Sequence, residues 1–175
     1  MYYTGKGDEG YTSLFGGERV AKDSPRIEAL GALDEATSAI GMARAAVVRQ
    51  ESRAILLRIQ HELHILMAEI ASPQPDRLPS RVQAEMVEAI ETDVALLEKS
   101  TPLPRTFIMP GETPGGAALD FARAVTRRAE RHAVSLLHQG EVRNEQIIRY
   151  LNRASSLLYV LARADDLAIG NSHNA

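Results

Sequence analysis

The segment "SPRIEALGALDEATSAIGMARAAV", Ser24–Val47, has the pattern of an amphipathic helix. Ser24 followed by Pro25 is a favourable N-cap and first-turn pair. Five apolar residues and Thr37 then recur at helical spacing and share one face: Ile27, Leu30, Leu33, Thr37, Ile40 and Val47. The segment therefore predicts a helix of about six turns that buries this face.

Four more segments repeat the same period, and no segment indicates a strand. Ser80 is the expected N-cap of the third helix, the fourth is expected to begin near Gly116, and Gly170 is expected to close the fifth. Helices of about 20 residues with short links pack as up-and-down bundles. The sequence therefore predicts an all-α, five-helix up-and-down bundle with a glycine-rich N-terminal extension.

Length and composition narrow the class of protein. A chain of 175 residues is expected to form one domain, with residues 1–23 as the extension and residues 24–170 as the bundle. The net charge of -3 gives no basic field, so nucleic acid is not an expected partner. Cysteine is absent, which excludes disulfides and thiolate chemistry. We expect a cytoplasmic protein, because no membrane span or signal peptide is evident.

The extension begins with the unusual segment "TGKGDEGYTSLFGG", Thr4–Gly17, in which five of fourteen residues are glycine. Successive backbone N–H groups in such a turn can surround an anion, and Lys6 adds charge. Thr4, Thr12 and Ser13 add hydroxyl donors. The segment is not a Walker A motif, because Gly7 follows the lysine where Ser or Thr is required. It predicts a polyphosphate site, with a flexible terminus as the alternative.

The fourth helical segment contains "ARAVTRRAERH", in which Arg123, Arg127 and Arg131 recur every four residues. Like charges at this spacing destabilise a helix, so an anionic ligand is expected to offset them. Glu130 lies on the same flank, but one carboxylate cannot balance three cations. Arg128 is expected to point away toward solvent. A solvated basic face is the alternative.

Asp34 is the third unusual feature. A helical wheel places it between Ile27 and Leu30, within the apolar arc of the first helix. A carboxylate that faces a core or an interface needs a partner, and Arg123 is a candidate. The proline-rich segment "STPLPRTFIMPGETPGG", residues 100–116, is expected to be a non-helical connection between the third and fourth helices. Five aromatic residues lie in this connection or in the glycine-rich extension, where they either plug the bundle ends or mark a ligand site: Tyr2, Tyr3, Tyr11, Phe15 and Phe107.

Five motifs resemble, in order and spacing, the ATP:cob(I)alamin adenosyltransferases of the propanediol-utilisation type. The motifs are "TGKGDEGYTSLFGGERVAKD", "RIEALGALDEATSAIG", "TFIMPG", "ARAVTRRAER" and "YLNRASSLLYVLAR". The resemblance implies a five-helix bundle that forms a homotrimer, with active sites between subunits. It also implies transfer of the 5'-deoxyadenosyl group of ATP to the cobalt of cob(I)alamin, with release of triphosphate.

The resemblance also implies roles for individual residues. The nucleotide-binding extension would comprise Thr4, Gly5, Lys6, Gly7, Thr12, Ser13 and Lys22. The remaining ATP contacts would be Arg127, Arg128, Glu130, Arg131 and Asn152. Asp34 and Arg123 resemble the inter-subunit ion pair of the family. Phe107 resembles the corrin-facing phenylalanine, which occupies the lower axial side of the cobalt and displaces the base.

This reaction needs no catalytic base, because cob(I)alamin is itself the nucleophile. The protein must align the reactants and stabilise triphosphate, with Mg2+ held mainly by phosphate oxygens. A di-iron bundle is a poor alternative, because His61 and His64 lack the second Glu-x-x-His motif that such a site requires. A non-catalytic helical module that binds a nucleotide or protein remains the alternative function.

Overall fold

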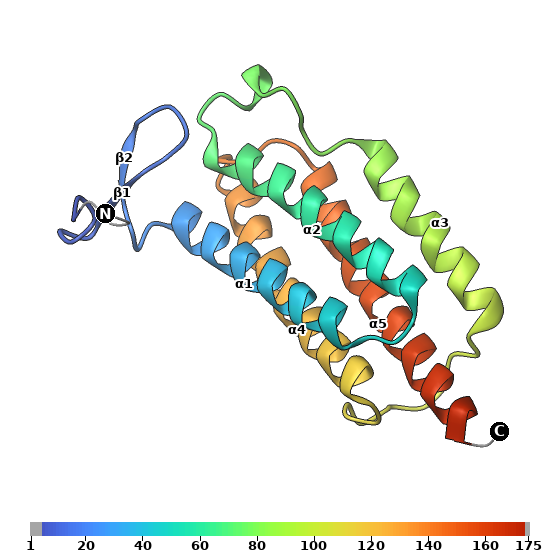
Figure 1. Ribbon diagram of the computed structural model, residues 1–175. Helices are drawn as coiled ribbons and strands as arrows, with labels where there is room; N and C mark the ends of the chain where they lie inside the picture. Colours follow the sequence, from blue (N-terminus) through green and yellow to red (C-terminus); the bar gives the residue numbers. More distant parts are fainter. Residues whose placement is uncertain (1–4, 174–175) are drawn as a thin grey trace.

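The computed structural model describes residues 5–173, so Thr4, Tyr2 and Tyr3 lie outside the described range. Within it, a short hairpin precedes five α-helices (Figure 1). The elements are β1 (Tyr11–Ser13), β2 (Arg19–Ala21), α1 (Pro25–Ala46), α2 (Gln50–Ala71), the 3-10 helix η1 (Pro75–Arg77), α3 (Ala84–Ser100), α4 (Pro114–His138) and α5 (Gln146–His173). No described helix combines the length and hydropathy needed to cross a bilayer.

The five helices alternate in direction, which confirms the predicted up-and-down bundle (Figure 1). Helices that pack together are not always consecutive in the chain. The principal contacts join α1 to α2 and α4, and α5 to α3 and α4. The connection between α2 and α3 and the connection between α3 and α4 lie at opposite ends of the bundle (Figure 1). The hairpin before α1 lies at the end opposite the loop that follows α3.

Alanine dominates the buried face of α1. The buried residues of this helix are Ala29, Ala32, Leu33, Ala36, Ala39, Ile40 and Ala43. On α4, Ala122, Ala129 and Ala133 are also fully buried. Because the distance between packed helices depends on the side chains at their contact, these residues let α1 and α4 approach closely.

The position of Asp34 differs from the prediction that it could face the core. Asp34 and Glu35 are exposed, whereas Leu33 and Ala36 on either side are buried. The predicted apolar arc was centred on Ile27 and Leu30 because the alanines were not counted as part of the buried face. Both residues are only half-buried. The core interpretation of Asp34 is therefore wrong, and the interface interpretation stays a prediction.

The expectation of no strand is also wrong. β1 and β2 pair antiparallel, with Thr12 opposite Val20, and the backbone N–H of Lys22 donates to the carbonyl of Gly10 at 2.9 Å. The turn contains Gly16 and Gly17 with φ of 102° and 89°, a region that glycine adopts readily. The backbone N–H of Phe15 donates to the Ala71 carbonyl at 3.1 Å and so ties the hairpin to the end of α2.

Three helix boundaries differ from the prediction. Ser80 does not cap α3, which begins at Ala84 with Gln83 as its N-cap. The reason is a long-range contact: the buried Glu69 carboxylate accepts from the backbone N–H of Val82 at 2.8 Å. Gly170 does not end α5, which continues to His173. The fourth helix begins at Pro114, two residues before the expected start.

A buried carboxylate joins α5 to the link between α1 and α2. Oδ1 of Asp165 accepts from the backbone N–H of Val48 at 3.0 Å, and Oδ2 has no hydrogen-bond partner within the described residues. A Cβ atom on Gly115 would collide with this carboxylate, so the glycine makes room for it. Burial raises the pKa of Asp165, and the Val48 N–H lowers it by less.

An Asp165→Asn variant tests whether burial of the ionised Asp165 carboxylate destabilises the fold. A carboxyl whose folded pKa is raised above its unfolded value of about 3.9 stabilises the fold below that value and loses this contribution as pH rises. The variant keeps an acceptor for Val48 but carries no charge. We expect its urea midpoint to exceed that of the native chain at pH 8, with the difference shrinking toward pH 4. A pH-independent difference would contradict this account.

Candidate functional site

The structure confirms the geometry of the arginine face on α4. Arg127 and Arg131 are exposed and Arg123 is half-buried at the edge of the apolar face. Nη1 of Arg131 donates to the backbone carbonyl of Arg127 at 3.0 Å. Within the described part of the chain, the Arg127 guanidinium has neither a hydrogen bond nor an ion pair. Its five donors are therefore available to an external acceptor.

A polar chain beside these arginines crosses three helices. Nδ2 of Asn152 on α5 donates to Glu130 on α4 at 3.1 Å, and Oδ1 of Asn152 accepts from Arg153 at 2.9 Å. Nε of Arg153 then donates to Glu91 on α3 at 2.8 Å. Glu130 and Asn152, which the family resemblance assigned to one site, are thus in contact. Asn152 holds the Glu130 carboxylate at the edge of the arginine face.

Arg128 does not simply point to solvent, as its position in the sequence suggested. It forms an ion pair with Glu35 on α1. The close approach of α1 and α4 makes this pairing possible. Exposed pairs of this kind contribute at most about 1 kcal/mol, so the contact leaves Arg128 free to change partner.

The hairpin brings two further candidates together. An added Cβ atom on Gly7 would lie 3.0 Å from Nζ of Lys22, so the ammonium lies over the glycine backbone. Lys6 is exposed, and its carbonyl accepts from Arg19 at 3.4 Å. Thr12 is half-buried on β1, whereas Gly5 and Ser13 are exposed. The hairpin therefore presents ammonium and hydroxyl donors around exposed backbone.

The hairpin and the arginine face do not meet within one chain. No hydrogen bond or ion pair among residues 5–173 joins them, and the hairpin extends beyond the end of the bundle (Figure 1). Asp34 and Arg123 are also unpaired with each other in the single chain. Nε of Arg123 instead lies 3.7 Å from Oδ1 of Asp120.

Phe107 lies in the long connection between α3 and α4, as predicted, and is 89% exposed. Met109, two residues later, is 77% exposed. Large apolar side chains left this open in water are unfavourable, and adjacent ones are a common sign of a binding surface. We name residues 101–113 the Phe107 loop.

Sequence reasoning missed several buried polar residues. Arg163 on α5 is 6% exposed and binds Asp120 on α4 at 2.6 Å. The hydroxyl of Tyr150 donates to Glu62 at 2.6 Å, and burial together with this carboxylate raises the pKa of Tyr150 well above its usual range. A charged residue within an apolar stripe is the signal that could have revealed Asp120 and Arg163.

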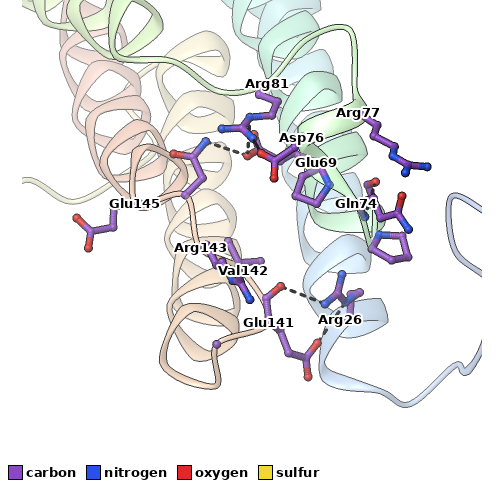
Figure 2. A pocket seen from close by; sticks show the side chains of 15 residues that line it. Arg26, Glu69, Gln74, Asp76, Arg77, Arg81, Glu141, Val142, Arg143 and Glu145 are labelled. Carbon is purple, nitrogen blue, oxygen red and sulfur yellow. Dashed lines mark hydrogen bonds and ion pairs between the residues drawn. The ribbon is translucent and has the colours of Figure 1, made fainter.

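A cavity of about 710 Å³ lies at the hairpin end of the bundle (Figure 2). Its charged lining is largely paired internally: Nε of Arg26 donates to Glu141 at 3.2 Å, and Nη1 of Arg26 donates to the Ile70 carbonyl at 3.0 Å. Nδ2 of Asn144 donates to Glu69 at 2.9 Å. These contacts join the start of α1 and the end of α2 to the link between α4 and α5, so we assign this cavity a structural role.

Stability measurements distinguish the free arginine from its neighbours. Arg127→Ala removes no contact within the described chain, so the free energy of unfolding should stay within about 0.5 kcal/mol of the native value. Asn152→Ala breaks two hydrogen bonds and should lower it by about 1 kcal/mol. The free energies of unfolding of the two variants are compared by urea denaturation in a phosphate-free buffer, because phosphate could bind Arg127. Equal losses would show that Arg127 has a structural role.

Comparison with known proteins identifies the family. The family model of the cobalamin adenosyltransferases matches residues 2–165. The chain is 40% identical over 166 residues to the corrinoid adenosyltransferase PduO of Citrobacter freundii, covering 94% of this chain and 49% of that protein. It is 38% identical over 167 residues to a second corrinoid adenosyltransferase of Citrobacter freundii, covering 94% of both. The chain thus spans about half the length of the PduO relative and nearly all of the second.

Solved structures show the same fold. A variant of the PduO-type ATP:corrinoid adenosyltransferase from Lactobacillus reuteri, complexed with cobalamin and ATP, is 28% identical with a TM-score of 0.86. The match covers 95% of this chain and 91% of that one. A second variant of the same enzyme, complexed with ATP, has a TM-score of 0.82 over 94% of each chain. With its five-helix bundle and the family match over residues 2–165, the chain belongs to the cobalamin adenosyltransferase family.

Proposed function

We propose that this chain is an ATP:corrinoid adenosyltransferase. It transfers the 5'-deoxyadenosyl group of ATP to the cobalt of a reduced corrinoid. The cobalt(I) electron pair forms a bond to C5', the C5'–O5' bond breaks, and triphosphate leaves with the electrons of that bond. The observation that carries the proposal is the Arg127 guanidinium on a polar helix face, without a partner among residues 5–173, within a chain of this family.

The arginine face and the hairpin suit the departing triphosphate. Arg127 and Arg131 offer planar donors that bind phosphate oxygens in pairs, and Lys6 and Lys22 add charge from the hairpin. Negative charge develops on the leaving oxygen as the C5'–O5' bond breaks. Fixed cations beside that oxygen lower the barrier because they need not reorganise during the reaction. No proton is removed from the nucleophile, so a general base is not required.

The residues present are compatible with Mg2+ that arrives on ATP. Among the described residues, no group of three or more His, Asp or Glu side chains could hold a metal by itself. Glu130 is the carboxylate beside the arginine face and is held by Asn152. When bound, Mg2+ would neutralise part of the phosphate charge. Glu130 would then orient a water molecule of the hydrated ion.

The Phe107 loop is the proposed corrinoid surface. The exposed Phe107 ring would cover the lower axial face of the cobalt and exclude the axial base. A cobalt(II) centre without that ligand is easier to reduce to the cobalt(I) nucleophile. The protein would therefore contribute to the reduction as well as to the alkyl transfer.

The proposed site lies between subunits of a homotrimer. The hairpin of one chain would face the arginines of its neighbour, because the two do not meet within one chain. Asp34 is exposed on α1, and Arg123 is half-buried with its Nε 3.7 Å from Oδ1 of Asp120. The terminal Nη donors of Arg123 have no hydrogen bond or ion pair within the described residues. We propose that these donors pair with Asp34 of the next subunit.

The activity is tested by mixing the protein with cob(I)alamin and MgATP under anaerobic conditions and recording the spectrum of the light-sensitive alkyl-cobalt product. Arg127→Lys keeps the charge but loses the planar donor pair, in which each charge-assisted hydrogen bond contributes about 1.5–3 kcal/mol. We expect kcat/KM for ATP to fall at least tenfold. Arg149→Lys, an exposed arginine on α5, is the matched control and should keep native kinetics. Nucleotide binding without product from the native chain would favour a non-catalytic module.

The shared site is tested by mixing two inactive variants. Lys6→Ala and Arg127→Ala chains are unfolded together in equal amounts and refolded. In a random cyclic trimer, an intact hairpin meets an intact arginine face with probability one half times one half, so about a quarter of native activity should return. If both parts came from one chain, every site would keep a lesion. No recovery in trimers shown to be mixed would exclude the shared site.

A further inference from the structure

The Phe107 loop is exposed in its middle but buried at both ends. Thr101, which follows α3, is 1% exposed, and Thr113, the N-cap of α4, is 5% exposed. Between them, Ile108 is half-buried and the residues from Arg105 to Phe107 are exposed. The direction of Phe107 therefore depends on how firmly the buried ends are held.

The Thr113 hydroxyl makes two hydrogen bonds, one as acceptor and one as donor. Its hydroxyl accepts from the backbone N–H of Gly116 at 2.9 Å, which caps α4. The same hydroxyl donates to Oδ1 of Asp166 on α5 at 2.8 Å. A Cβ atom on Gly116 would collide with the Asp166 carboxylate, so glycine is required for the two helices to meet here.

Asp166 is in turn fixed by a buried charge. Nη2 of Arg163 lies 3.0 Å from Oδ2 of Asp166 and 2.6 Å from Oδ2 of Asp120. The other oxygen of Asp120 lies 3.7 Å from Nε of Arg123. Buried charges hold their geometry tightly, because removing one partner strands the other. A continuous polar network therefore runs from the end of the Phe107 loop to the proposed subunit contact at Arg123.

We propose that Thr113 and Asp166 are positioning residues for the corrinoid, which hold the Phe107 loop in the orientation that receives the ring. This inference rests on the proposed function. A pre-oriented loop binds more tightly because less freedom is lost on binding. Neither residue need touch the corrinoid, so their loss should weaken its binding while leaving ATP binding intact.

Three variants separate this positioning from helix capping. Asp166→Ala removes the loop anchor but leaves the Thr113 cap on Gly116 and the Arg163 pair with Asp120. Thr113→Val removes both anchor and cap, and Thr113→Ser keeps both. We expect Asp166→Ala and Thr113→Val to raise KM for cob(II)alamin under reductant at least fivefold, with KM for ATP within twofold of native. Thr113→Ser should behave as the native chain.

Two further variants are controls: one alters the Phe107 loop directly, and the other removes a threonine hydroxyl outside the loop. Phe107→Ala should reproduce the rise in corrinoid KM. Thr92→Val on α3 removes a threonine hydroxyl that donates to a helical carbonyl, at 2.9 Å from the Glu88 oxygen, and should change neither KM. Hydrogen exchange gives a readout independent of activity: residues 105–112 should exchange faster in Asp166→Ala, whereas the middle of α4 should not.

The outcomes distinguish failure of this inference from failure of the proposed function. If the native chain forms the alkyl-cobalt product but Asp166→Ala keeps its corrinoid KM and loop exchange, the positioning role is wrong. A rise in corrinoid KM with Thr113→Val alone would assign the effect to helix capping and also overturn the inference. A native chain that forms no product contradicts the proposed function itself, and with it the corrinoid role of the loop.

Discussion

Alanine side chains on α1 and α4 let the two helices approach closely, and the placement of the polar surface follows from this contact. With the alanine faces turned inward, the free guanidinium of Arg127 must point away from the core. The same constraint places Asp34 and Glu35 on the outer surface of α1. Arg128 can then reach Glu35 across the helix pair. Close packing of small residues thus creates an outer face that carries both signs of charge.

The two ends of the bundle use buried charge in different ways. At the hairpin end, the guanidinium of Arg26 and the carboxylate of Glu69 bind backbone groups and close the gaps between helix ends. At the other end, Arg163 joins two carboxylates that reach the Phe107 loop and Arg123. The first arrangement is complete within one chain. The second ends at surfaces that are open in one chain, which suits a site completed by another subunit and by substrate.

Local patterns indicated part of the candidate site, and the family resemblance supplied the rest. The glycine-rich extension and the four-residue spacing of the arginines are properties of short segments. Lys22 and Asn152 were implied only by the resemblance, and in the structure Lys22 lies over Gly7 and Asn152 binds Glu130. Asp34 was misplaced because the helical wheel counted large apolar residues alone. In a helix that packs through alanine, the alanines define the buried face. The residues that hold the proposed corrinoid surface in position were not predictable, because Thr113 meets Asp166 only through the packing of α4 on α5.

Five helices, their approximate lengths and the aromatic residue in the proline-rich connection could all be predicted from the sequence. These features depend on residues within a few turns of one another, through helical periodicity, capping and the exclusion of proline from helix interiors. Tertiary structure decided where α3 begins, because Glu69 binds the backbone of Val82 from another element. It also decided the partners of Asp120, Arg163 and Asp166. Buried charges need compensation wherever the fold brings an opposite charge, and no local pattern specifies which distant residue that will be.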